Sequence, residues 1–152
     1  EKVGGGIHSR RTAVVSTVFA DIGAALDGRM NTLSGGSAIA WQNTVFKPTK
    51  TALYLKPTNL PVSASQTGLG ASGIDQHTGI YQVDVYAIAG KGRNAAEVKA
   101  DAVADHFKRG TDLTYNGITV RLGDTSRNTG IIVDDRFVIS VSINYTAHVA
   151  PR

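Results

Sequence analysis

The sequence of 152 residues contains no cysteine. A chain without thiols forms no disulfide, no zinc–thiolate site and no cysteine nucleophile, so all three kinds of site are excluded. Charged residues make up only 18% of the chain, below the roughly 25% typical of soluble domains. No apolar run approaches the roughly 20 residues that span a bilayer, and no basic start leads into an apolar signal segment. We therefore expect a protein made in the cytoplasm whose sparsely charged surface is partly hidden in an assembly.

Acidic residues are missing from a long stretch between Asp27 and Asp75. The cations of this stretch equal the whole net charge of +4, and they are Arg29, Lys47, Lys50 and Lys56. A segment with charge of one sign can steer a protein towards an anionic partner. The same residues can equally be solvated side chains on a strand and its flanks. The sequence is consistent with both interpretations.

Hydrophobic spacing predicts a single α+β domain over residues 1–152, which begins with a glycine-rich arm at residues 1–8. The expected order is α-β-β-(long loop)-β-α-β-β, with two helices packed on one face of a mostly antiparallel sheet. The first expected helix opens at Ser9 or Thr12, has an apolar stripe that includes Phe19 and ends near Asn31. The second expected helix is capped by Asn94 and ended by Gly110. Strands are expected at 38–46, 51–56, 81–89 and 137–149, with a hairpin at 113–122.

The segment from residue 57 to residue 79 is polar and rich in serine, threonine, glycine and glutamine. Pro57 is expected to stop the strand before it. Loops beyond about 12–15 residues without structure of their own are uncommon and usually functional or disordered. We predict a contact loop that becomes ordered on assembly, with polar contacts at Asn59, Gln66, Gln76 and His77. A second polar loop is expected at 123–130.

Two glycine-rich motifs resemble nucleotide-binding loops. Residues 68–73 spell G-x-G-x-x-G, but a strand rather than a helix is expected after them, which argues against a dinucleotide site. Residues 90–93 lie between an expected strand and helix but lack the P-loop pattern, so an NTPase is rejected. Two alternatives stay open for residues 90–93: a weak anion contact at Lys91 and Arg93, or an ordinary turn without a ligand.

No constellation of catalytic residues or metal ligands is evident. No histidine is paired with another metal ligand at helical spacing. Asp134 and Asp135 are adjacent, and adjacent residues of an extended chain point to opposite faces, so we expect them to cap a turn rather than form an acid–base pair. The aromatic residues lack the basic interleaving of single-strand binders. We expect no enzyme, no metal and no cofactor.

Several segments, taken in order, resemble the tail terminator and tail-completion proteins of long-tailed, siphovirus-type bacteriophages. They are residues 39–43 (Ile-Ala-Trp-Gln-Asn), 54–55, the Gly-rich loop that follows, 78–85, 100–107 with 109–111, and 137–145. The resemblance covers about residues 12–149 and leaves out the N-terminal arm. It implies an α+β subunit of a six-membered ring that caps the tail tube, stops its polymerisation and offers a surface for head–tail joining in the neck.

The partners implied by this resemblance are further copies of the chain, the major tail tube protein and the head–tail connector or stopper protein. DNA would only pass through the lumen, and no membrane is involved. The implied location is the head-proximal end of the virion tail, after assembly in the host cytoplasm. On physical grounds, we expect the contact loop to touch the tube or a neighbouring subunit, and the four cations to line a lumen or an inter-ring face. The alternatives are another connector or neck ring protein, and a small α+β nucleic-acid-binding module.

Overall fold

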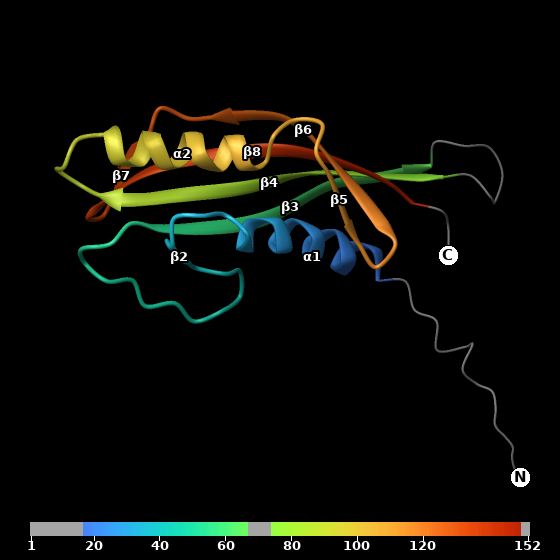
Figure 1. The fold of residues 1–152 in the computed structure, drawn as a ribbon, viewed down its shortest axis with the longest axis horizontal. Helices are drawn as coiled ribbons and strands as arrows, with labels where there is room; N and C mark the ends of the chain where they lie inside the picture. Colours follow the sequence, from blue (N-terminus) through green and yellow to red (C-terminus); the bar gives the residue numbers. More distant parts are fainter. Residues whose placement is uncertain (1–16, 67–73, 150–152) are drawn as a thin grey trace, which may run out of the picture.

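Alternation of apolar and polar residues builds a sheet that carries two helices (Figure 1). The structure is a computed structural model and describes residues 17–66 and 74–149. Within these residues, seven strands form one sheet in the order β2-β3-β4-β8-β6-β5, and β7 pairs with β8. The helices are α1 (Val18–Asn31) and α2 (Asn94–His106), and the strands are β2 (Ala38–Ile39), β3 (Tyr54–Gln66), β4 (Asp75–Ile88), β5 (Asp112–Tyr115), β6 (Ile118–Arg127), β7 (Ile131–Val133) and β8 (Arg136–Val149).

The centre of the sheet consists of β4 and β8, which pair antiparallel along their whole length. Val83 pairs with Val141 and Val85 pairs with Ile139, and all four side chains are buried. They belong to one hydrophobic cluster that also includes the apolar sides of both helices. The short pair of β2 and β3 is parallel, while the other pairs are antiparallel. The predicted α+β class with a mostly antiparallel sheet is therefore confirmed.

Both helices pack on the same face of the sheet, as predicted. Tyr81 of β4 donates a hydrogen bond to Oδ1 of Asp27 in α1 at 2.6 Å. The ring of the same tyrosine lies 5.5 Å from the ring of Phe107, which follows α2. The helices also contact each other directly, because Nε of Arg29 donates to the carbonyl oxygen of His106 at 3.0 Å. These contacts leave the opposite face of the sheet without a helix among the described residues.

The predicted loop at 57–79 is wrong for residues 57–66 and 75–79. Strand β3 continues through Pro57 to Gln66, and β4 already begins at Asp75. The proline does not stop the strand because β3 lies near the edge of the sheet, where a missing outward N–H costs no ladder bond. Residues 67–73, which include the G-x-G-x-x-G motif, lie outside the described residues, as do the arm at 1–8 and the expected helix start at Ser9 or Thr12.

Three other expected boundaries also differ. The strand expected at 38–46 is only the two residues of β2, because the chain turns at Asn43 with a φ of 58°. The polar loop expected at 123–130 is wrong for 123–127, since β6 continues to Arg127 through a bulge after Leu122. The strand β7 was not predicted. Helix α2 ends at His106, before the expected stop at Gly110.

Two expectations for the helices are also corrected. Asn94 is the first residue of α2 rather than its cap, and the cap residue Arg93 makes no side-chain cap hydrogen bond. Phe19 is 56% exposed instead of buried, and its ring lies 5.1 Å from that of His77. By contrast, the hairpin turn at Asn116 and Gly117 is confirmed, with φ angles of 51° and 81° that suit a type I′ turn.

Candidate functional site

The face of the sheet away from the helices is polar along its middle. In one row across the sheet, Lys56 pairs with Asp84, which pairs with Ser140. The hydroxyl of Ser140 donates to Oδ1 of Asp84 at 2.6 Å, and Nε2 of Gln82 donates to the same oxygen at 3.0 Å. Hydroxyl and amide groups thus satisfy this carboxylate within the chain. This part of the face is a surface for polar contacts rather than a reactive site.

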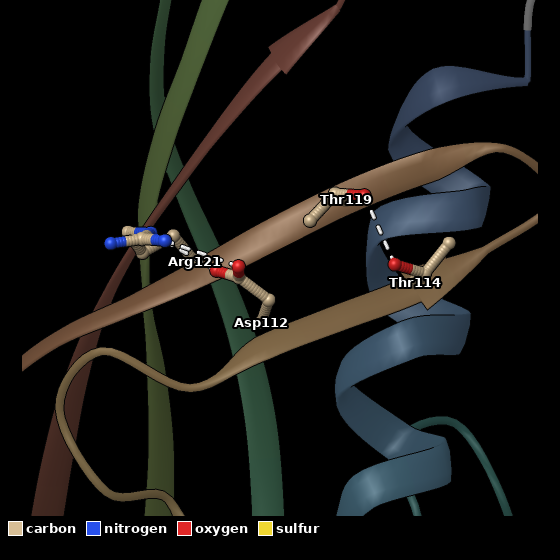
Figure 2. Close-up of polar contacts among 4 residues, drawn as sticks. All are labelled: Asp112, Thr114, Thr119 and Arg121. Carbon is tan, nitrogen blue, oxygen red and sulfur yellow. Dashed lines mark hydrogen bonds and ion pairs between the residues drawn. The ribbon is translucent and has the colours of Figure 1, made fainter.

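The β5–β6 end of the same face carries a second polar network (Figure 2). Arg121 binds Asp112 through two hydrogen bonds of 3.0 and 3.1 Å, and the hydroxyls of Thr114 and Thr119 lie 3.0 Å apart. These cross-strand pairs fix the register of the hairpin. A hollow of about 350 Å³ next to them is lined by Asp112, Thr119, Arg121, Thr146 and His148.

The opposite end of this face holds the largest hollow that we describe, a groove of about 560 Å³. The rings of Tyr54 and Tyr86 stack in parallel, with centroids 4.7 Å apart, and Phe46 lies 4.9 Å from Tyr54. Burial raises the pKa of both tyrosines above the usual value. We call this hollow the aromatic groove, and its lining is Ala40, Trp41, Gln42, Asn43, Thr44, Phe46, Pro48, Tyr54, Lys56, Thr58 and Tyr86.

A single arginine fixes the segment of residues 40–53 that forms one wall of the aromatic groove. Arg136 of β8 is buried, and its guanidinium donates to the carbonyl oxygens of Ala52, at 2.6 Å, and of Thr49. The guanidinium also lies 5.1 Å from the centre of the Tyr54 ring, a cation–π arrangement. The irregular segment is therefore held against the sheet, and the groove is preformed.

The outer edge of β3 has no free N–H donor over residues 57–61. The N–H of Asn59 points away from β4 and donates to Oε1 of Gln42 at 3.1 Å. Because N–H groups alternate sides along a strand, residues 57 and 61 face the same way as residue 59. Both are proline and have no N–H to donate. This edge, which we call the guarded edge, is protected against strand pairing.

The opposite edge of the sheet is open beyond Leu122. On that side Leu122 donates to the carbonyl oxygen of Thr111 at 2.9 Å and accepts from the N–H of Gly110 at 2.8 Å. After this point, no described strand pairs with the outer side of β6 or of β7. The β7 side chains Ile131, Ile132 and Val133 are 56%, 61% and 39% exposed. We call this edge the open edge, because its strands are unpaired on the outer side and its apolar side chains are exposed within the described residues.

The four cations expected to line a lumen do not lie together. Arg29 is on the helical side, where it binds the carbonyl oxygen of His106. Lys56 lines the aromatic groove, and Lys47 and Lys50 are exposed on the segment beside it. Of the three lysines only Lys56 thus lines the groove, while the arginine joins the two helices.

The four polar contact residues of the expected loop also have different environments. Asn59 accepts a hydrogen bond of 2.8 Å from the hydroxyl of Tyr145, so it joins β3 to β8. His77 is buried against Phe19, and Nδ1 of this histidine has no hydrogen-bond partner among residues 17–66 and 74–149. Gln76 is half-buried on the polar face, and the backbone of Gln66 pairs with Asp75. A role for these residues in contacts with a partner stays a prediction.

The expected anion contact at 90–93 lies in an exposed turn before α2. Arg93 forms an ion pair of 3.3 Å with Glu97 one helical turn later, so part of its charge is engaged within the chain. Lys91 is exposed. This arrangement is that of an ordinary solvated turn, and an anion contact there stays a prediction.

Among residues 17–66 and 74–149, no cluster of three or more histidine or acidic side chains could hold a metal ion. No helix of this described part has the length and apolar character needed to cross a membrane. Asp134 and Asp135 form the turn between β7 and β8, as expected, and Asp134 has a φ of 56°.

Sequence reasoning missed the aromatic groove and the open edge. The alternation of Tyr54, Lys56 and Thr58 across Pro57 was a signal that the strand continues. Three β-branched residues in a row, directly before the turn at Asp134, were a signal for β7. The groove itself depends on residues far apart in the sequence, so no local pattern indicates it.

Comparisons with known proteins agree with this architecture. A solved protein structure superposes with a TM-score of 0.71 at 24% sequence identity, covering 90% of this chain and all of that one, which shows a shared fold. No curated protein matches the sequence. The family model described as phage tail terminator protein matches residues 21–145, well over half of the chain. The chain therefore belongs to a phage tail terminator family, and it is a structural protein of the virion tail.

Proposed function

We propose that this chain forms the ring that caps the head-proximal end of the phage tail tube. The ring ends the polymerisation of the tube and provides the surface for head–tail joining. The family match over residues 21–145 carries this proposal. The open edge supports it, because an apolar edge strand that is exposed in one subunit needs a neighbour to cover it.

The proposed partners follow from this role. They are further copies of the chain, with six in the ring, the major tail tube protein and the head–tail connector or stopper protein. DNA only passes through the lumen, and assembly takes place in the host cytoplasm. The chain needs no catalytic group for this work, since binding alone stops the addition of tube subunits.

The experiment is to polymerise the purified tail tube protein of the same phage with and without this chain. Tube lengths and tube ends are then recorded by electron microscopy. We expect shorter tubes, with the chain found at one end only. Tubes of unchanged length and bare ends would contradict the proposal. Binding to the connector but not to the tube would instead indicate a neck ring protein.

A further inference from the structure

We infer that a hairpin of one copy inserts into the aromatic groove of the next copy, and that this contact closes the ring. The inserted part is residues 131–135, which we call the β7 hairpin. The inference rests on the proposed function, because it names the two surfaces through which such a ring would be built.

The first argument is the apolar character of both faces of β7. Successive side chains of a strand point to opposite faces, so Ile132 faces one way while Ile131 and Val133 face the other. All three are exposed. A flat partner surface would cover only one of these faces. A groove can cover both, and the aromatic groove is lined by Trp41 and by a continuous aromatic cluster of Phe46 and the stacked tyrosines.

The second argument is charge. Asp134 and Asp135 follow β7 directly, are exposed, and take part in no ion pair within the described parts of the chain. Around the groove stand Lys47, Lys50 and Lys56, which are likewise in no ion pair of residues 17–66 and 74–149. Charges of opposite sign thus border two apolar surfaces that no other described residue covers. Such complementarity orients a contact and disfavours wrong partners.

The third argument is position. A single row of paired residues crosses the sheet from Ile131 through Val138 and Tyr86 to Tyr54. Ile131 therefore lies at one end of the row and Tyr54 of the groove at the other, while Asp135 in the turn is close enough to Tyr54 that, besides burial, its charge helps to raise the pKa of that tyrosine. One copy can present its hairpin to one neighbour and its groove to another. A contact between two different surfaces is heterologous, and it closes into a ring when the rotation between copies permits.

The same features disfavour the other ways in which two copies could meet. Two β7 hairpins placed against each other would bring four aspartates together, and like charges at an interface are costly. A continuous sheet between copies is blocked at the guarded edge by Pro57, Pro61 and the occupied N–H of Asn59. Insertion of side chains into the groove needs no ladder of backbone bonds there.

The test uses charge reversal on each surface of the full chain, with the mass in solution measured by sedimentation. The hairpin variant is Asp134→Lys/Asp135→Lys, and the groove variant is Lys47→Glu/Lys50→Glu. Each variant alone places like charges across the contact, so we expect assembly to need at least about tenfold more protein than the wild type. A control on the exposed side of α2 is Asp105→Lys, matched to the single variant Asp134→Lys, and we expect it to assemble like the wild type because Asp105 takes part in no ion pair of the described residues.

Mixing the hairpin variant with the groove variant gives the decisive result. In the mixture every hairpin can meet a groove of opposite charge, so we expect the assembled mass to return. A covalent readout guards against misfolded variants, because the chain has no cysteine of its own. Ile132→Cys mixed with Thr58→Cys should give disulfide-linked pairs on mild oxidation, while the same pairing of Val98→Cys with Thr58→Cys should not.

The outcomes separate this contact from the proposed function. Rings that form in both variants as in the wild type would overturn the hairpin–groove contact and leave the ring intact. A wild-type chain that stays monomeric at every concentration would also overturn the contact, while tube capping is judged by the tube-length experiment. Loss in each variant with recovery on mixing supports the contact.

Discussion

The two edges of this sheet solve the problem of an exposed strand in opposite ways. At the guarded edge, Pro57, Pro61 and the bond between Asn59 and Gln42 remove every outward donor over five residues. At the open edge, the three residues of β7 keep an unpaired side and expose apolar side chains. The comparison teaches that the sheet disfavours strand pairing on one side and leaves it possible on the other, as a directed assembly requires.

The largest effect should follow from a change that breaks the open edge. Gly130 precedes β7 with a φ of 90°, and a Cβ at this position would overlap the ring of Phe137. We expect Gly130→Ala to lower the free energy of unfolding by about 2–3 kcal/mol, because backbone strain and overpacking add. Chemical denaturation measures this loss, and sedimentation should show that assembly is lost with it.

A matched control for this change is Gly28→Ala in α1. Gly28 lies inside the helix, and a Cβ there would meet nothing within 4 Å. Alanine in place of a helical glycine should raise the free energy of unfolding by about 0.5–1 kcal/mol. Equal losses at both glycines would show that the open edge has no special geometry.

Ionisation of Tyr81, in the middle of the sheet, should destabilise the whole fold and therefore both edges alike. Burial, together with the hydrogen bond to Asp27, raises the pKa of Tyr81 above its usual value of 10.0. The folded state therefore favours the neutral phenol. This stabilisation is complete below about pH 10 and is lost as the pH rises further. We expect the free energy of unfolding to fall steeply above about pH 10.

The variant Tyr81→Phe sharpens this pH experiment. It removes the 2.6 Å bond to Asp27 and should cost about 1 kcal/mol at pH 7. It should also flatten the decline above about pH 10, since no phenol remains there to ionise. If the variant and the wild type lose stability in parallel between pH 9 and pH 11, then Tyr81 is not the group responsible.

The smallest effect on stability should come from opening the guarded edge. Pro61→Thr with Gln42→Ala restores one outward donor and frees another, both on the exposed side of β3. We expect the free energy of unfolding to change by less than about 1 kcal/mol. The solution behaviour should change more, with larger irregular aggregates in light scattering. Gln42→Ala alone is the control. Unchanged scattering in the double variant would show that Pro61 and Gln42 do not limit aggregation at this edge.

The fold could be predicted from the sequence where one residue pattern decides the structure. The alternation from Phe137 to Val149 indicated β8, and Asn116-Gly117 indicated the hairpin of β5 and β6. Both patterns depend on local chemistry. The strand after Pro57 could not be predicted, since a proline is acceptable only when its strand lies at an edge, and edge position is a tertiary property. In the same way Phe19 matched the apolar stripe of α1, yet its ring packs only against His77 of β4 among the aromatic rings described and stays 56% exposed.

The interaction surfaces were predictable only in part. The shortage of acidic residues between Asp27 and Asp75 predicted a basic surface, which stays a prediction, and of its four cations Lys56 lines the groove while Lys47 and Lys50 are exposed on the segment beside it. The fourth, Arg29, donates a hydrogen bond to the carbonyl oxygen of His106 in the other helix, a partner 77 positions away. Contacts of that range leave no trace in a local pattern.

Hydrogen exchange at increasing protein concentration tests the central claim most directly. The account predicts that amides of residues 131–135 and of residues 41–48 gain protection together as the chain assembles, whereas residues 57–61 stay unchanged. Protection that appears first along residues 57–61, or along neither edge once rings have formed, would contradict it.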